Sequence, residues 1–187
     1  MPPLTCTGNA RSANSTAVMT AIPTLAEAVC LTLVAREPTH GWSIVKTLAA
    51  DGEIGRVWSL SRPLTYRALA ALAAADLIEP AGSEPGAGPP RTIWRATAKG
   101  RRAARSWLRR PVSHPRDMRT EFLLKVVLGA PAADLSRAQL EAFAPAFAGL
   151  QRAVAGDPAD VVARWRLESA EATRRFLESL AANDRDQ

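Results

Sequence analysis

Apolar residues recur along this chain mainly at helical spacing, and two short runs of strand-like residues interrupt them. A helix predicted from Thr24 to about Arg36 carries apolar residues around most of its circumference, so we expect it to be buried on several sides. Pro38 ends it, because the residue before a proline disfavours helical geometry. A short second helix follows, with its apolar positions at Trp42, Ile44, Val45 and Leu48.

A third helix is predicted over residues 61–76, with Ser61 as its cap. It leads into a strand at 77–79, a Pro/Gly-rich tip at 81–90 and a return strand at 92–97. The next helix begins after its cap at Thr97 and has its apolar face at Ala103, Ala104, Trp107 and Leu108. Helix, helix, two-stranded ribbon and helix, in this order, are typical of a winged helix-turn-helix that reads DNA.

The last third of the chain carries the pattern of packed helices. One helix is predicted around residues 122–127, closed by Gly129 and Pro131. A longer helix, which Pro145 should kink, has a 3-4-3-4 spacing at Leu140, Phe143, Phe147, Leu150 and Val154. A last helix repeats a similar pattern at Val162, Trp165, Ala172, Phe176 and Leu180. Such stripes fit either the core of one domain or the seam of a dimerisation arm.

We therefore predict a mostly α (α+β) protein in three parts. Residues 1–22 are polar and aperiodic, so we expect a disordered tail, with Met19 as an alternative start. Residues 23–112 form the winged helix with its two-stranded wing, and residues 113–187 form a C-terminal α-helical dimerisation domain. We assign the dimer seam to Phe143, Phe147, Val162, Trp165, Phe176 and Leu180.

The third helix has one face suited to the major groove of DNA. At 100° per residue, the inward arc holds Leu64, Ala68, Leu69 and Leu72. Arginine on the opposite arc and on the return strand can donate to a guanine edge or to a phosphate. The candidate DNA-binding residues are Ser61, Arg62, Thr65, Tyr66, Arg67, Ala70, Arg91 and Arg95. The alternative is a solvated helix face beside a solubilising edge strand.

Charge is distributed unevenly along the chain. It has 24 Lys and Arg against 18 Asp and Glu, a net charge of +6. Residues 36–119 carry 15 basic and 7 acidic residues, whereas residues 120–187 carry 8 and 10. The basic part favours double-stranded DNA as a partner, and the mildly acidic, amphipathic part favours a contact with protein or ligand.

Few residues are suited to catalysis or to metal binding. Two histidines and two cysteines cannot supply the spacing of a zinc site, and no phosphate-binding Gly-rich loop or nucleophile elbow is visible. We therefore expect no enzymatic activity, no metal and no cofactor. Cys30 lies in an apolar run, which indicates a buried thiol. Neither a membrane-spanning run nor a secretory signal is visible, so we expect a cytoplasmic protein without membrane contact.

Several motifs resemble those of PadR-type transcriptional regulators. They are His-Gly-aromatic at His40–Trp42, Tyr-x-Ala-Leu-x-x-Leu at Tyr66–Leu72, Leu-Ile-Glu at Leu77–Glu79, Arg-aromatic-Arg at Arg91, Trp94 and Arg95, Thr-x-x-Gly at Thr97–Gly100, and Arg-x-Glu-Phe at Arg119–Phe122. The resemblance covers about residues 24–180. Many members have Ser-Pro-Gly-Thr-Leu-Tyr-Pro where this chain has Ser61 to Arg67, so two arginines here replace small residues or proline.

The resemblance implies a homodimer built through the C-terminal helices and the first helix. It also implies repression, relieved by a small molecule in some members. We predict a sequence-specific DNA-binding regulator, a repressor that binds a pseudo-palindromic operator as a homodimer. The alternative is a small-molecule-sensing regulator whose C-terminal aromatic residues hold a flat inducer, with Trp107 and Trp165 as candidate ligand contacts.

Overall fold

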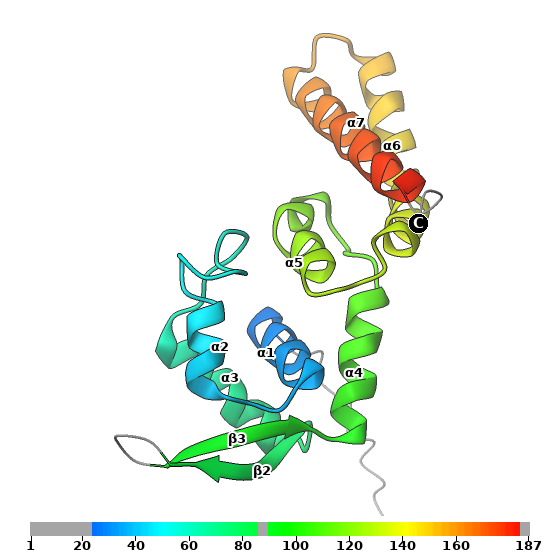
Figure 1. The fold of residues 1–187 in the computed structure, drawn as a ribbon. Helices are drawn as coiled ribbons and strands as arrows, with labels where there is room; N and C mark the ends of the chain where they lie inside the picture. Colours follow the sequence, from blue (N-terminus) through cyan, green and yellow to red (C-terminus); the bar gives the residue numbers. More distant parts are fainter. Residues whose placement is uncertain (1–23, 86–89, 184–187) are drawn as a thin grey trace, which may run out of the picture.

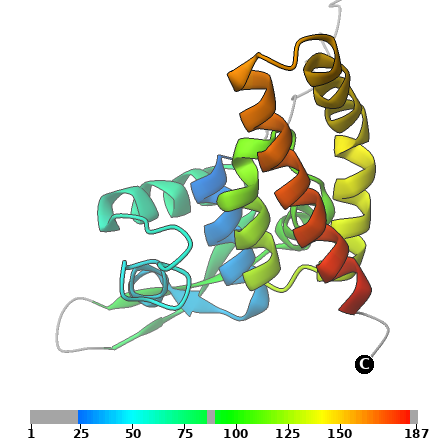
Figure 2. The same cartoon turned by 90° about the horizontal axis from the view of Figure 1, so that it is seen from above.

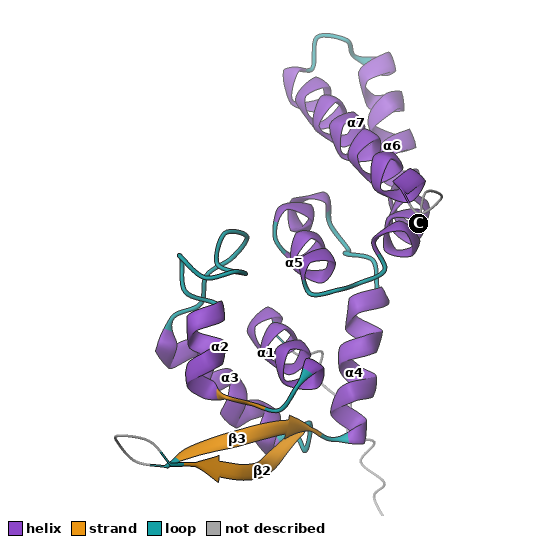
Figure 3. Cartoon of the chain, viewed as in Figure 1, coloured by secondary structure: helices purple, strands orange, loops and turns teal. Residues whose placement is uncertain are grey.

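The structure is a computed structural model that describes residues 24–85 and 90–183. It is mostly helical, as predicted, with a small sheet at one end (Figures 1 and 3). The helices are α1 (Leu25–Arg36), α2 (Gly41–Thr47), α3 (Arg62–Ala74), α4 (Ala98–Arg109), the 3-10 helix η1 (Pro115–Arg119), α5 (Glu121–Val127), α6 (Ala132–Gly156) and α7 (Val161–Ala182). The strands are β1 (Thr39–His40), β2 (Ile78–Glu84) and β3 (Arg91–Ala96). The predicted tail at residues 1–22 lies outside the described residues.

The sheet has three strands in the order β1-β3-β2, and neighbouring strands are antiparallel. β2 and β3 form the predicted wing, although β2 continues to Glu84, well past the predicted end at Glu79. The pairing of β2 with β3 is irregular between Pro80 and Gly82. β1 is a third strand that the sequence did not predict, because its two residues are too few to show an alternating pattern.

Local signals in the sequence define the starts of the helices. Thr24 forms a capping box with Glu27 at α1: each side chain accepts a hydrogen bond from the backbone N–H of the other. At α2, His40 Nδ1 accepts from the N–H of Ser43 at 3.0 Å, which gives this histidine a structural role. Ser61 lies at the N-cap of α3 as predicted, but its side chain makes no capping hydrogen bond.

The winged-helix part encloses one apolar core around α1, which packs against α3, α4 and β3. The Cys30 side chain is fully buried, as predicted, and burial raises the pKa of its thiol to about 12. From α3, Leu69 and Leu72 enter this core. The inward prediction for Leu64 was wrong: its side chain is 39 % exposed. The buried residues of α3 begin only at Thr65, so the first turn lies at the margin of the core.

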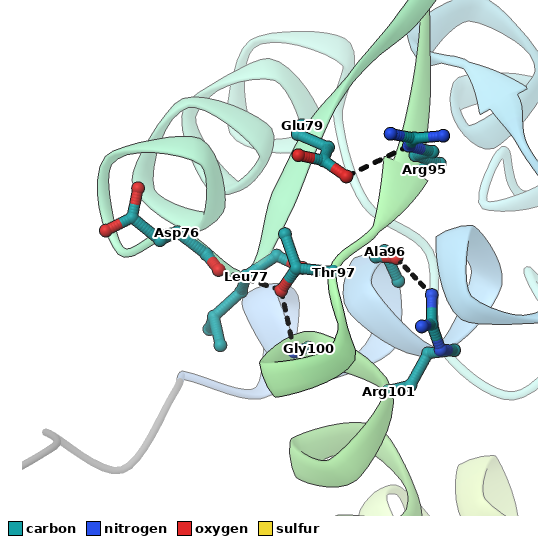
Figure 4. Close-up of polar contacts among 8 residues, drawn as sticks. All are labelled: Asp76, Leu77, Glu79, Arg95, Ala96, Thr97, Gly100 and Arg101. Carbon is teal, nitrogen blue, oxygen red and sulfur yellow. Dashed lines mark hydrogen bonds and ion pairs between the residues drawn. The ribbon is translucent and has the colours of Figure 1, made fainter.

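The start of α4 passes close to the backbone of the wing (Figure 4). Thr97 Oγ1 donates to the carbonyl of Asp76 at 2.9 Å and accepts from the N–H of Gly100 at 3.0 Å, so Thr97 caps α4 as predicted. A Cβ atom at Gly100 would lie 2.0 Å from the carbonyl oxygen of Leu77. Glycine therefore allows α4 to pack directly against the backbone of Leu77, just before β2.

A second apolar cluster holds the C-terminal helices together. α6 and α7 pack side by side as a hairpin, at the end of the molecule opposite the wing (Figures 1 and 2). Phe143 of α6 and Leu177 of α7 are buried there with Phe122 of α5. The side-chain amide of Gln139 joins this cluster to the segment after α4. Its oxygen accepts from the N–H of Val112 at 2.7 Å, and its nitrogen donates to the carbonyl of Val112 at 3.0 Å.

Residues of and just after α5 contribute to both clusters, Phe122 to the second and Leu124 and Leu128 to the first. The α5 segment therefore connects the winged helix to the hairpin. The predicted domain division between residues 112 and 113 stays a prediction. Pro145 lies inside α6, which is continuous, and the kink predicted there stays a prediction as well.

Candidate nucleic-acid interface

One face of α3 is exposed to solvent, as helical spacing predicted. The side chains of Arg62, Arg67 and Ala70 are exposed, and that of Tyr66 is 43 % exposed. The prediction that Thr65 belongs to this face was wrong. Its side chain is fully buried, and its hydroxyl donates to the carbonyl of Ser61 at 3.1 Å, which satisfies the polar atom within the helix.

An open groove of about 740 Å³ lies between α3 and β3. Its walls come from three places in the chain: Arg62, Tyr66 and Ala70 of α3, Arg91 and Trp94 of β3, and His40 and Trp42 at the start of α2. Arg67 and Arg95 do not line this groove. The winged helix thus presents a concave surface with a basic rim beside the exposed face of α3.

The two arginines of the return strand differ in their surroundings. Arg91 lines the groove and has no carboxylate partner among the described residues. Arg95 Nε donates to Glu79 Oε1 at 2.9 Å across the wing, and both side chains are about half exposed (Figure 4). The register of the strands places Glu79 directly opposite Arg95. Arg95 therefore forms an ion pair across the wing, whereas Arg91 lies opposite Glu84 in the strand register but forms no ion pair among the described residues.

Aromatic rings surround the guanidinium of Arg62. The carbon Cζ of Arg62 lies 5.7 Å from the ring centroid of Trp42 and 5.8 Å from that of Tyr66. Lys46 Nζ lies 5.9 Å from the same Trp42 ring. Sequence reasoning placed Trp42 only among the apolar residues of the second helix. Its nearness to Arg62 depends on how α2 and α3 cross, which spacing along one helix does not reveal.

His40 ties the start of α2 to the wing. Its Nδ1 atom accepts from Ser43, and its Nε2 atom lies 3.7 Å from Glu84 Oε2, at the end of β2. The first turn of α2, which carries Trp42, is thereby linked to the end of β2.

The C-terminal residues predicted for the dimer seam fall into two groups. Val162, Trp165 and Phe176 are exposed on α7, Trp165 by 71 %. Phe143 is only 2 % exposed, and its ring packs edge-on against Phe147 at 5.8 Å between centroids. Phe143 therefore belongs to the core of a single chain and cannot lie in an exposed seam, which corrects that prediction. The partly buried Phe147 and Leu180 also pack against this inner cluster.

Trp107, a predicted ligand contact, is packed inside the protein. It is 7 % exposed, and its Nε1 donates to Glu121 Oε1 at 3.0 Å. The same oxygen lies 2.7 Å from Lys125 Nζ, and the Lys125 side chain is fully buried. Burial lowers the pKa of Lys125, and Glu121 partly opposes this change. A ring held in this cluster has no free face for a ligand, so the prediction for Trp107 was wrong.

Comparison with known proteins adds a family to this geometry. Residues 30–106 match the transcriptional regulator PadR-like family. Over this range the chain is similar to that family. The match includes α2, α3, the wing and most of α4, and thus every wall of the groove. The family is one of transcriptional regulators, not of enzymes.

Two solved structures are similar to the chain. Bacillus subtilis PadR in complex with operator DNA is 22 % identical, with a TM-score of 0.44, and the match covers 83 % of this chain and 97 % of that one. Bacillus subtilis PadR in complex with p-coumaric acid is 21 % identical, with a TM-score of 0.42, covering 85 % and 98 %. No curated protein matches the chain. Within the described residues, no helix is long and apolar enough to cross a membrane.

Proposed function

We propose that this protein is a sequence-specific DNA-binding transcriptional regulator that binds a pseudo-palindromic operator as a homodimer and represses transcription there. The observation that carries the proposal is the exposed face of α3 beside a groove with a basic rim. A major groove about 12 Å wide admits one helix, and a neighbouring wing then lies within reach of the phosphate backbone.

Charge around the groove supports a polyanionic partner. Among the described residues, no carboxylate forms an ion pair with Arg62, Arg67 or Arg91. Uncompensated guanidinium groups on one face release counterions when they meet phosphates, which favours binding and makes it sensitive to salt. Arginine also forms bidentate hydrogen bonds with a guanine edge, which gives sequence preference.

The exposed apolar side chains of α7 support the homodimer. Val162 and Trp165 lie on one helix and leave large apolar surfaces in water when the chain is alone. A two-fold pair of chains buries the same surface on each partner and presents two α3 helices to DNA. Half-sites then lie one helical turn, about 34–36 Å, apart, so the operator repeats its sequence with inversion.

The test is selection of binding sites by the full-length protein from random double-stranded DNA. We expect an inverted repeat, a dimer by analytical ultracentrifugation, and a plot of log affinity against log salt with a slope of about −5 to −9. Arg67→Ala should weaken binding to the selected site by about 1–3 kcal/mol and relax the preference at one base pair. Placing the selected site in a promoter should lower transcription.

Arg152→Ala, on the exposed side of α6, removes the same charge far from the groove and is the matched control. It should leave affinity unchanged. A slope near zero, or equal effects of the two substitutions, contradicts DNA binding through α3. A monomer at micromolar concentration contradicts the homodimer.

One observation favours a second candidate function, a regulator that a small molecule releases from DNA. A mainly apolar pocket of about 350 Å³ lies between η1, α5 and α7, lined by Met118, Arg119, Leu123, Ala172, Thr173 and Phe176. A planar aromatic acid, with p-coumaric acid as the first probe, should bind saturably in calorimetry and lower DNA affinity. Leu123→Trp should fill the pocket and abolish the heat of binding. A signal that Leu123→Trp does not change contradicts this site.

A further inference from the structure

The guanidinium of Arg62 lies near two aromatic rings from different helices. Trp42, at the start of α2, and Tyr66, one turn along α3 from Arg62, both have ring centroids within 6 Å of its Cζ atom. Trp42 is partly buried, and its ring also lies 5.9 Å from Lys46 Nζ on the same helix. We refer to Trp42, Arg62 and Tyr66 as the aromatic cradle.

The backbone at Gly41 brings the two rings close enough to form this cradle. A Cβ atom at Gly41 would lie 2.8 Å from Tyr66 Cε1 and 3.2 Å from Leu69 Cδ1. The Tyr66 ring therefore rests directly on the first turn of α2, and only glycine leaves room for it. His40 caps the same turn by accepting from the N–H of Ser43, which anchors the backbone that carries Trp42.

A cation attracted to ring faces keeps its hydrogen-bond donors available. The ring quadrupole attracts the guanidinium without accepting its in-plane N–H bonds. No carboxylate forms an ion pair with Arg62 within the described residues, so nothing there competes for these donors. The group is thus restricted in motion and still unsatisfied, at the mouth of the groove between α3 and β3.

We propose that Trp42 is a positioning residue: with Tyr66 it holds the Arg62 guanidinium so that Arg62 reads one guanine in the major groove. The inference rests on the proposed DNA-binding function and adds a residue that helical spacing did not assign. An arginine already restricted before binding loses less conformational freedom when it meets the base. The cradle thereby restricts the Arg62 side chain to positions from which it can bind one guanine selectively.

A double-mutant cycle on the full-length protein tests the proposal. The variants are Trp42→Leu, Arg62→Ala and both together, measured on the selected operator. Arg62→Ala should weaken binding about 5- to 150-fold, and Trp42→Leu about two- to fivefold. Trp42→Leu should have no further effect once Arg62 is gone. Trp42→Phe keeps a ring and should lose less than Trp42→Leu.

Arg67→Ala supplies the matched control, because Arg67 is exposed on the same helix outside the cradle. Combined with Trp42→Leu, its effect should be additive. Replacing single guanines of the operator by 7-deazaguanine, which lacks the N7 acceptor, should identify one position at which Arg62→Ala has no additional effect. If Trp42→Leu and Arg62→Ala are additive, or if Arg62→Ala weakens all sequences equally, the proposal is wrong.

A measurement without DNA separates this proposal from the proposed function. In the free protein, the Nε–H proton of Arg62 should show a ring-current shift in NMR spectra, which Trp42→Leu and Tyr66→Leu each reduce. An unshifted proton overturns the cradle even if DNA binding is intact. A shifted proton in a protein that binds no DNA instead overturns the proposed function, and with it the reading of guanine.

Discussion

The winged helix and the α6–α7 hairpin differ in what they leave exposed. Among the described residues of the winged helix, the exposed large apolar side chains are Leu64 and Tyr66, both in the first half of α3. In the hairpin they are Val161, Val162, Trp165 and Phe176, all on α7. The winged helix buries most of its apolar side chains in one core and exposes a face that is mainly polar. The hairpin has a smaller core, and several large apolar side chains of α7 are exposed to solvent.

An apolar stripe on a helix can therefore belong to the core of one chain or form a surface for a second one. α1 of the winged helix is apolar on nearly all sides, and neighbouring elements cover it. α7 has a comparable number of apolar residues, but it buries only Ala163, Ala170 and Leu177, and Val162 and Trp165 stay exposed. The exposed side is complete only against another surface, which we propose is a second copy of this chain.

The largest effect is expected where the two regions meet, at the buried Lys125. Its Nζ atom donates to Glu121 and to the carbonyl of Arg110, each at 2.7 Å. Glu121→Ala should lower the free energy of unfolding by about 3–5 kcal/mol, because it leaves a buried cation without its counterion. Lys125→Met should cost little, and the double variant should regain most of the loss. Chemical denaturation measures all three.

Alkaline pH tests the same pair. Burial lowers the pKa of Lys125 below 10.5 in the folded protein, so the unfolded chain binds more protons there. The contribution of Lys125 to the free energy of unfolding should therefore rise as the pH rises towards 10.5, and Lys125→Met should abolish that rise. If removing Glu121 is harmless at neutral pH, α5 does not join the regions through a buried charge.

Two leucines of α3 test the closed core of the winged helix. Leu69 is 2 % exposed and Leu64 is 39 % exposed. Leu69→Ala should cost about 2–5 kcal/mol, because it opens a cavity, whereas Leu64→Ala should change stability by about 0.5 kcal/mol or less. Thermal unfolding of both variants at equal concentration provides the comparison. If Leu64→Ala and Leu69→Ala lose similar stability, Leu64 packs in the core, as helical spacing predicted.

Trp165 tests the open helix of the hairpin. Because the side chain is 71 % exposed in one chain, Trp165→Ser should not destabilise a monomer. In a dimer seam, loss of a central aromatic residue should raise the dissociation constant about 30-fold, equivalent to about 2 kcal/mol. Sedimentation at several concentrations measures it, with Leu64→Ser as the control for an exposed apolar residue in the other region. Unchanged assembly of the Trp165 variant contradicts the seam.

Cys30 probes the core of the winged helix through pH. Its pKa is raised to about 12 in the folded protein, against 9.0 for an ordinary cysteine, so the unfolded chain loses its proton first. Stability present below pH 9 should fall by about 2 kcal/mol by pH 10.5, because the folded state still holds the proton. Cys30→Ala should abolish this fall, and Cys6→Ser is the matched control. If the free energy of unfolding falls equally with pH in Cys30→Ala and in Cys6→Ser, the thiol of Cys30 is not buried as described.

The smallest effect is expected at the wing. The pair of Arg95 and Glu79 is about half exposed on both sides, so Arg95→Ala should cost at most about 1 kcal/mol of stability. Arg91→Ala should cost none, but should weaken DNA binding more than Arg95→Ala does, because only Arg91 lines the groove. Affinity for the selected operator distinguishes the two. If Arg95→Ala loses more affinity for the operator than Arg91→Ala does, DNA contacts the other face of the wing.

Spacing and capping residues predicted much of the winged helix, because the relevant forces act within one element. The cap at Thr97 and the exposed face with Tyr66 and Arg67 are examples. Errors arose where burial depends on a second element. Leu64 lies on the inward arc of α3 but beyond the reach of the core, and Thr65 satisfies its own hydroxyl and can be buried.

The same limit applies to charged and aromatic side chains. A buried lysine is rare unless it is paired. The pair of Lys125 with Glu121 is an i,i+4 contact within α5, but the burial of Lys125 and its bond to the carbonyl of Arg110 need the segment between α4 and α5. The cradle around Arg62 needs the crossing of α2 and α3. Periodicity identifies faces of single helices, and sites that form between helices lie outside what it can predict.

Pro145 has a consequence for the motions of α6. Proline has no amide hydrogen, so the carbonyl of Glu141 lacks its helical partner, and Glu141 is exposed on the helix surface. The ladder of backbone bonds is therefore weakened midway along the helix. Amide protons beyond Pro145 should exchange with deuterium faster than those before it, so the hairpin frays from its outer tip while the half beside Gln139 stays closed.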